Sequence, residues 1–250
     1  MANWSDPNAG LQGQPRGRLD TGERDVAFDA GLRSYMLKVY NYMASGILLT
    51  GIVAMLFARG GAESPAATII YAGGPLAWVI MLAPLAFVMV MSFGLNRLST
   101  GALQACFWAF AVVMGLSLST IFLRYTGTSI AQTFFATSAA FVSLSLWGYT
   151  TKKDLSGWGT FLLMGLIGLI VAMVINIFLQ SAAFDFVISA IGVLIFAGLT
   201  AYDTQKIKSM YAYVAGTEMM GKTVIMGALN LYLDFLNMFL FLLNFMGGRD

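Results

Sequence analysis

TVIMGALNLYLDFLNMFLFLLNFM, residues 223–246, is an apolar stretch long enough to cross a membrane as a single helix. Its polar residues Asn230, Asp234, Asn237 and Asn244 are spaced by four, three and seven positions, which places them on one helical face. Lipid cannot satisfy amide or carboxyl groups, so this face must point into a bundle of other helices. The stretch therefore predicts a polytopic helical membrane protein.

Six further apolar runs precede this one, and hydrophobic residues make up 58% of the 250-residue chain, against about 45 to 50% in a typical globular domain. The runs are continuous rather than alternating, which argues against a membrane β-barrel. We therefore expect an all-α bundle of seven transmembrane helices. The first six are predicted at residues 36–58, 75–95, 101–123, 129–150, 157–180 and 184–207.

Residues 1–31 are polar and rich in turn formers, and we expect a disordered cytoplasmic tail there, followed by a membrane domain over residues 32–250. The apolar core starts too late and runs too long for a secretory signal, so the first helix should be an uncleaved span. With the N-terminus inside, eleven Lys and Arg residues lie on the inner side and three on the outer side, which predicts an N-in, C-out orientation. The eleven are Arg16, Arg18, Arg24, Arg33, Lys38, Arg97, Lys152, Lys153, Lys206, Lys208 and Lys222, and the three are Arg59, Arg124 and Arg249.

The sequence contains no histidine, which excludes Ser-His nucleophilic catalysis and histidine-based metal or haem ligation. The lone Cys106 rules out an intrachain disulfide. Residues 216–223, GTEMMGKT, match the phosphate-loop pattern, but no strand precedes them and two membrane helices flank them. We expect no enzymatic activity, no cofactor, and neither nucleotide nor nucleic acid as a ligand.

Two aspartates stand out because an ionisable group at membrane depth costs at least about 2.5 to 3.5 kcal/mol and usually lines a wet cavity or an ion path. Asp234 lies within the last span, and Asp203 lies near the inner end of the span before it. A short inner loop makes these two helices antiparallel neighbours, so the carboxyl groups can meet if the last helix begins before Thr223. Asp203 has an alternative role as an interfacial acid balanced by Lys206 or Lys208.

Two carboxyl groups in contact would share one proton and titrate as a pair. Deprotonated, they would suit a hard cation such as Ca²⁺, with water or the pore-lining candidates Asn230 and Asn237 completing its shell. The Asn residues could equally be hydrogen-bonding contacts between helices. Arg97 could reach a carboxylate as a charged latch or serve as an ordinary positive-inside anchor. Asp185, at the start of the sixth span, is expected to complement the helix dipole.

Four segments carry a resemblance: GYTTKKDLSGWG (148–159), VINIF (174–178), AYDTQKIK (201–208) and LNLYLDFLNMFLFLL (229–243). From about Arg33 onward the chain resembles the bacterial branch of the Bax inhibitor-1 family. The resemblance implies six helices around a central seventh and a pH-sensitive calcium leak through the inner membrane. It also implies that Asp203 and Asp234 form the sensing dyad and that Arg97 matches the latch. The acid that some relatives carry in the second helix is absent from residues 75–95.

Three functions compete. The first is a proton-regulated cation leak. The second is a regulator of stress survival or quality control that binds a membrane protease, with the basic segment 16–24 as its contact. The third, an intramembrane aspartyl protease, fails because Leu231, Tyr232 and Leu233 replace the Gly-x-Gly element before Asp234 and no proline follows Pro84.

Overall fold

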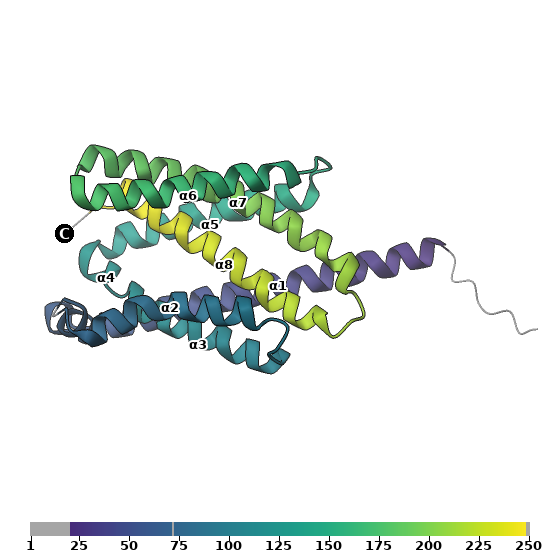
Figure 1. The fold of residues 1–250 in the computed structure, drawn as a ribbon, viewed down its shortest axis with the longest axis horizontal. Coiled ribbons are helices and arrows are strands. Elements are labelled where there is room, and N and C mark those ends of the chain that lie inside the picture. The colour runs from purple at the N-terminus through teal and green to yellow at the C-terminus, as the bar shows by residue number, and fades with distance from the viewer. Residues whose placement is uncertain (1–20, 72, 249–250) are drawn as a thin grey trace, which may run out of the picture.

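The computed structural model describes the backbone of residues 21–71 and 73–248, and the side chains of residues 26–70 and 73–248. The tail before Thr21, with Arg16 and Arg18, lies outside the described residues, as does Arg249. Within the described part the chain folds into helices alone (Figure 1). They are α1 Thr21–Phe57, η1 Gly61–Glu63, η2 Ala67–Tyr71, α2 Pro75–Gly94, α3 Thr100–Leu118, α4 Ile121–Arg124, α5 Gly127–Thr150, α6 Ser156–Leu179, α7 Ala182–Val214 and α8 Met219–Met246.

Seven of the described segments are long and apolar enough to cross a membrane, as the sequence predicts. They are α1, α2, α3 together with the short α4, α5, α6, α7 and α8. The protein is therefore a multi-pass membrane protein. Its orientation across the bilayer remains a prediction.

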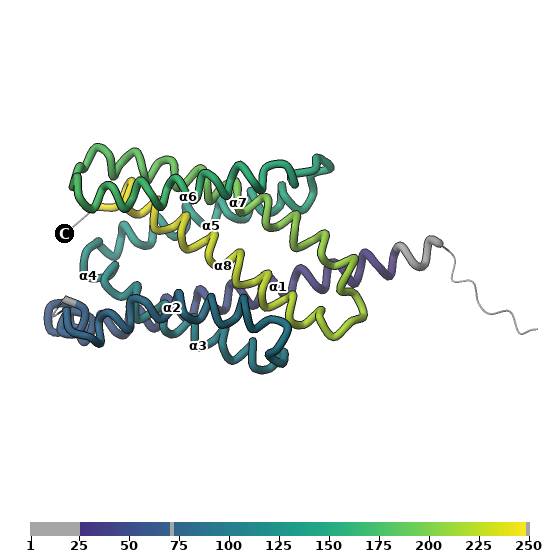
Figure 2. The backbone as a smooth tube through the Cα atoms, in the orientation of Figure 1, coloured from purple at the N-terminus to yellow at the C-terminus, as the bar shows by residue number. Residues whose placement is uncertain are grey.

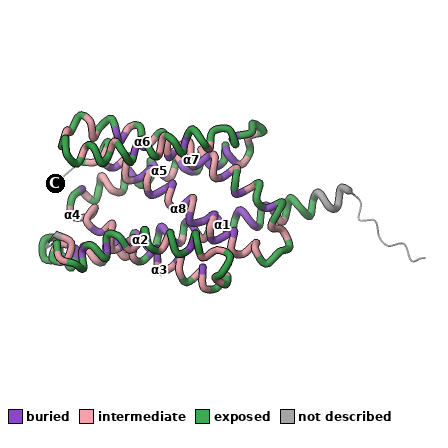
Figure 3. Tube along the Cα trace, viewed as in Figure 1, coloured by how far each residue is buried: buried purple, intermediate pink, exposed green. Residues whose placement is uncertain are grey.

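Helix α8 is the centre of the bundle. Its path can be followed in Figure 2 between a layer formed by α1, α2 and α3 and a layer formed by α5, α6 and α7. In its most apolar window 67% of the residues are buried, whereas no other span exceeds 33%. The contrast with α6, whose surface is mostly exposed, is visible in Figure 3. Helix α8 contacts α1, α3, α5 and α7, which enclose the polar face predicted from the sequence.

Three helix ends differ from the predicted ones. Helix α1 begins at Thr21, inside the segment assigned to the tail, because residues 23–30 contain neither Gly nor Pro and carry acids that favour a helix N-terminus. Helix α7 continues to Val214, and α8 begins at Met219 rather than Thr223. Together, the last two changes bring Asp203 and Asp234 closer to the same depth, measured from the ends of α7 and α8 that the short loop joins.

Small residues set the distance between α5 and α7. A Cβ atom added at Gly148 would overlap the backbone carbonyl oxygen of Ala201, so α5 and α7 can touch there only because this position has no side chain. In contrast, nothing lies within 4 Å of the corresponding point at Gly168 in α6. The same substitution should therefore have opposite effects at the two positions.

We expect Gly148→Ala to lower the free energy of unfolding by about 1 to 3 kcal/mol, because a backbone oxygen cannot move aside. Gly168→Ala should raise it by up to about 1 kcal/mol, because alanine is the better helix former and meets no neighbour. Thermal unfolding in detergent, followed by tryptophan fluorescence, measures both changes. Equal shifts of the same sign would contradict the close approach of α5 and α7.

Candidate functional site

Asp203 and Asp234 meet inside the bundle. Asp203 is half-buried within α7, and Asp234 is 5% exposed on α8. Asp203 lies eleven residues before the end of α7, about 17 Å, and Asp234 fifteen residues after the start of α8, about 23 Å. The two aspartates therefore differ in depth, measured from these helix ends, by about one helical turn, which side chains on crossing helices can span.

The two carboxyl groups lie within hydrogen-bonding reach of each other. Asp234 Oδ2 is fully buried and receives no hydrogen bond from any donor group among the described residues. A buried oxygen without a donor is costly, and a hydrogen bond between two carboxyl groups requires a proton on one of them. The geometry therefore suits a pair that holds one proton between its two members.

The positive charge that acts on Asp203 comes from Lys206, one turn further along α7. Lys206 is exposed, and its Nζ lies 5.9 Å from the centre of the Tyr202 ring. The alternative role of Asp203, an acid balanced by Lys206, is thus compatible with its contact to Asp234. Lys208 acts elsewhere, because its Nζ donates to the carbonyl oxygen of Tyr149 at 2.7 Å.

Two of the segments that carry the family resemblance interlock and fix the position of α7. The Gln205 side chain lies between the backbone groups of the α5–α6 loop. Its Nε2 donates to the Lys153 carbonyl oxygen at 2.8 Å, and its Oε1 accepts from the Leu155 N–H at 2.8 Å. Lys208 adds its bond to Tyr149, and a Cβ atom at Gly159 would come within 2.5 Å of the Tyr202 hydroxyl. Segment 201–208 is thereby held against segment 148–159, with Asp203 turned toward α8.

The α5–α6 loop is itself braced by Asp154, whose Oδ1 accepts the Ser156 backbone N–H at 2.9 Å. Hydrogen bonds from the Ser156 side chain and backbone lower the pKa of the exposed Asp154 carboxyl. These hydrogen bonds favour the ionised form of Asp154. The neighbouring basic residues Lys152 and Lys153 are exposed to solvent. The loop presents mixed charge close to the end of the bundle that holds the dyad.

A chain of hydroxyl groups runs beside the dyad. The Tyr40 hydroxyl of α1 lies 2.6 Å from Ser145 Oγ of α5, and that oxygen lies 2.9 Å from Thr204 Oγ1 of α7. Thr204 Oγ1 donates in turn to the Thr200 carbonyl oxygen at 2.7 Å. Because Thr204 follows Asp203 in the sequence, three helices are tied together next to the acidic pair. The sequence offered only the small polar residues of these helices as a signal for this network.

None of the other predicted site residues forms a hydrogen bond or an ion pair with Asp203 or Asp234 within the described part of the chain. Asn230 and Asn237 are half-buried on α8, and Asn237 Nδ2 donates within its own helix to the Leu233 carbonyl oxygen at 2.8 Å. Arg97 is exposed in the turn between α2 and α3. Among the described residues it forms no ion pair with Asp203 or Asp234, so its role as a latch remains a prediction for another state of the protein.

Lys222 occupies the phosphate-loop pattern but has a structural contact. Gly221, Lys222 and Thr223 lie in the first two turns of α8, and the described segment before them is helix α7 rather than the strand that a phosphate loop requires. Lys222 Nζ donates to the Leu95 carbonyl oxygen at 3.1 Å, which joins the start of α8 to the end of α2. The absence of a nucleotide site remains a prediction.

A second polar cluster, at the opposite end of α8, was not predicted as a unit. Asn244 Nδ2 donates to Asp185 Oδ2 at 2.9 Å and to Ser189 Oγ at 2.8 Å, and the Tyr125 hydroxyl donates to Asn244 Oδ1 at 3.3 Å. Asp185 does lie in the first turn of α7, but the N-cap is Ser181. A cavity of about 320 Å³ opens beside this cluster and includes Arg124 and Thr120. The spacing of Asp185 and Ser189 by four positions was the signal that could have paired them with Asn244.

The comparisons with known proteins agree with this architecture. The family described as "Inhibitor of apoptosis-promoting Bax1" matches residues 32–250. A protein of Rickettsia prowazekii is 47% identical over 92% of this chain and 96% of its own length, and one of Caulobacter vibrioides is 44% identical over 90% and 92%. The Escherichia coli inner membrane protein YbhL is 43% identical over 88% of this chain and 94% of its own. With its seven spans, central α8 and nearly full-length match, the chain belongs to the Bax inhibitor-1 family.

Proposed function

We propose that the protein is a passive cation pathway of the inner membrane, with Ca²⁺ as its cargo and with the Asp203–Asp234 pair as its proton-sensitive gate. The observation that carries the proposal is the contact of two carboxyl groups from adjacent helices at a place shielded from lipid. Such a placement has a large cost for a purely structural contact, whereas a neutral Asn–Asn pair would join α7 and α8 without a charge.

The chemistry of the pair fits a hard divalent cation. When both carboxyl groups are ionised they offer up to four oxygen atoms and a charge of about −2, and Ca²⁺ takes six to eight oxygen ligands. No group of three or more acidic, His or Cys side chains that could hold a metal gathers among the described residues. Two carboxylates supplemented by water would bind a cation weakly enough to release it, as conduction requires.

Protonation provides a physical basis for gating. With one shared proton, the carboxyl groups attract each other and hold α7 against α8. With no proton, two carboxylates in a low-dielectric site repel each other unless a cation lies between them. Proton and Ca²⁺ thus compete for the same oxygen atoms, and each favours a different spacing of the two helices. Arg97, close to the start of α3, is the predicted cation for a state in which the pair is ionised without Ca²⁺.

We expect Asp203→Asn and Asp234→Asn each to reduce Ca²⁺ flux by about tenfold, because one charged ligand is lost and such interactions contribute about 1.5 to 3 kcal/mol. Both substitutions should also flatten the dependence of flux on pH. The measurement is Ca²⁺ entry into proteoliposomes that contain a fluorescent indicator, across a pH series. Glu63→Gln, which neutralises an exposed acid in η1, is the control and should behave as wild type.

Wild-type flux and pH profile in both Asn variants would contradict the gate.

Removal of residues 2–20 should leave the flux intact, because the cation pathway needs only the helical bundle. This deletion also removes Arg16 and Arg18, so it separates transport from any activity that depends on a partner of the tail.

Competition between proton and cation gives a second expectation. Binding of one Ca²⁺ should release about one proton from the wild-type protein. The apparent Kd for Ca²⁺ should therefore fall about tenfold for each unit by which the pH rises, over the range in which the pair still holds its proton. Asp234→Asn removes the carboxyl group with which Asp203 would share that proton, so the proton release should be smaller than in the wild type.

Isothermal titration calorimetry in two buffers with different ionisation enthalpies counts these protons directly. Equal proton release by the wild type and Asp234→Asn would contradict the shared-proton mechanism, even if both proteins bind Ca²⁺.

A further inference from the structure

A long groove opens between α1 and α5, and neither Asp203 nor Asp234 is part of its lining. Both helices pack on α8, and the space that separates them has a volume of about 800 Å³. Apolar side chains from three helices form most of its lining, among them Met43, Ile47, Phe134, Phe141, Val142 and Phe235. Phe235 of α8 forms part of the floor, so the groove is a gap in the layer of helices that surrounds α8.

The length of the groove matches the thickness of a bilayer. On α1 it runs from Arg33 to Met55, which is about 33 Å at the rise of an α-helix, and the hydrocarbon core of a bilayer is about 30 Å thick. One end is therefore at the level of lipid head groups, and the other end is near the opposite membrane face.

The volume and the lining of the groove suit a hydrocarbon chain. Apolar chains in contact lie about 4.0 to 4.5 Å apart, so a single acyl chain occupies a cross-section of about 20 Å². A volume of about 800 Å³ is therefore sufficient for one such chain along the groove. The residues that line the groove are mostly apolar, and Arg33 is the one charged residue among them.

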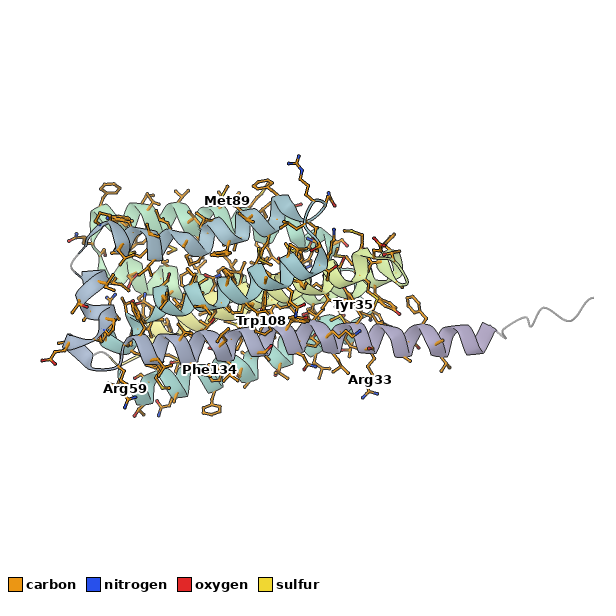
Figure 4. All side chains as sticks on the ribbon, turned by 90° about the horizontal axis from the view of Figure 1, so that it is seen from below. Arg33, Tyr35, Arg59, Met89, Trp108 and Phe134 are labelled. Carbon is orange, nitrogen blue, oxygen red and sulfur yellow. The ribbon has the colours of Figure 1, made fainter. Side chains whose placement is uncertain are left out.

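The charge at one end identifies the kind of lipid. Arg33 lines the groove and is exposed, and its guanidinium group has the geometry to bind a phosphate with two hydrogen bonds. Figure 4 labels Arg33 and Arg59 toward opposite ends of the apolar part of α1. Arg59 does not line the groove, so the basic charge at its lining is confined to the Arg33 end.

We propose that this groove is a phospholipid-binding site, in which one acyl chain lies between α1 and α5 and the phosphate contacts Arg33. The chain passes Gly51, where nothing lies within 4 Å of the point that a Cβ atom would occupy, and ends near Met55 and Phe122. Tyr40 and Ser145, two members of the hydroxyl chain beside Asp203, also line the groove. The bound lipid thus closes the bundle laterally next to the acidic pair.

Gly51→Trp tests the site by filling the groove at a position where an added side chain meets open space. We expect it to weaken the binding of dioleoylphosphatidylglycerol to the purified full-length chain by about tenfold, measured by native mass spectrometry during a lipid titration. Gly168→Trp is the matched control, because Gly168 is exposed on α6, has equally open surroundings and lies outside the groove. Thermal unfolding of both variants verifies that the fold is intact.

Arg33→Gln tests the phosphate contact. It should weaken binding of the same lipid by about tenfold, whereas Arg59→Gln should leave it unchanged. Dioleoylglycerol, which has the same acyl chains but no phosphate, should bind wild type and Arg33→Gln equally.

Unchanged lipid binding in Gly51→Trp would overturn the proposal. So would dimers that disappear in Gly51→Trp while the number of bound lipids stays constant, because the groove would then hold a second copy of the chain. Equal loss of lipid in Gly51→Trp and Gly168→Trp would show that binding is general to the apolar surface and would overturn the site as well.

Discussion

A polar face on a helix in lipid has to be covered, and this constraint shapes the whole bundle. Helix α8 carries Asn230, Asp234, Asn237 and Asn244 among Leu, Met and Phe residues, so no part of its length can face acyl chains on every side. The other spans form its cover, and they can afterwards expose apolar residues to lipid without cost. That division explains why α8 is mostly buried while α6 is mostly exposed.

The contact between Asp203 and Asp234 depends on how α7 is held against its other neighbours. Gly148 allows α5 to touch α7 at Ala201, and Gln205 fixes α7 to the loop that joins α5 and α6. Both fixed points lie within one turn of Asp203. The acidic pair is thus supported by uncharged contacts. In the proposed mechanism these contacts would not change when the proton leaves, so the repulsion between two carboxylates would act on α8 and the free length of α7 rather than on the α5–α7 contact.

The features of the fold that depend on hydrophobic periodicity and on the solvation of polar groups could be predicted from the sequence. The number of spans, the inward polar face of residues 223–246 and the antiparallel pairing of the last two helices all follow from lengths and spacings. Helix ends were less accurate, because α1 and α7 continue beyond the apolar runs into polar residues that form helix equally well. Contacts such as Gln205 with the α5–α6 loop, or Asn244 with Asp185, depend on which helices pack side by side, and single-residue patterns carry little of that information. The role of Arg97 stays open for a related reason, since a flexible exposed side chain has no position that sequence can specify.

The two ends of the α7–α8 pair differ in the chemistry that joins them. At one end Asn244 donates to Asp185 and Ser189, and this bond set lies beside a polar cavity that contains Arg124. An amide does not titrate, so this junction keeps its donors at any ordinary pH. At the other end the junction is the carboxyl pair, which in the proposed mechanism would lose its hydrogen bond when its proton leaves. Under the proposed gating mechanism, a change of protonation would therefore loosen α7 from α8 at the Asp203 end, whereas the amide donors of Asn244 would hold the opposite end, so that the two helices would pivot.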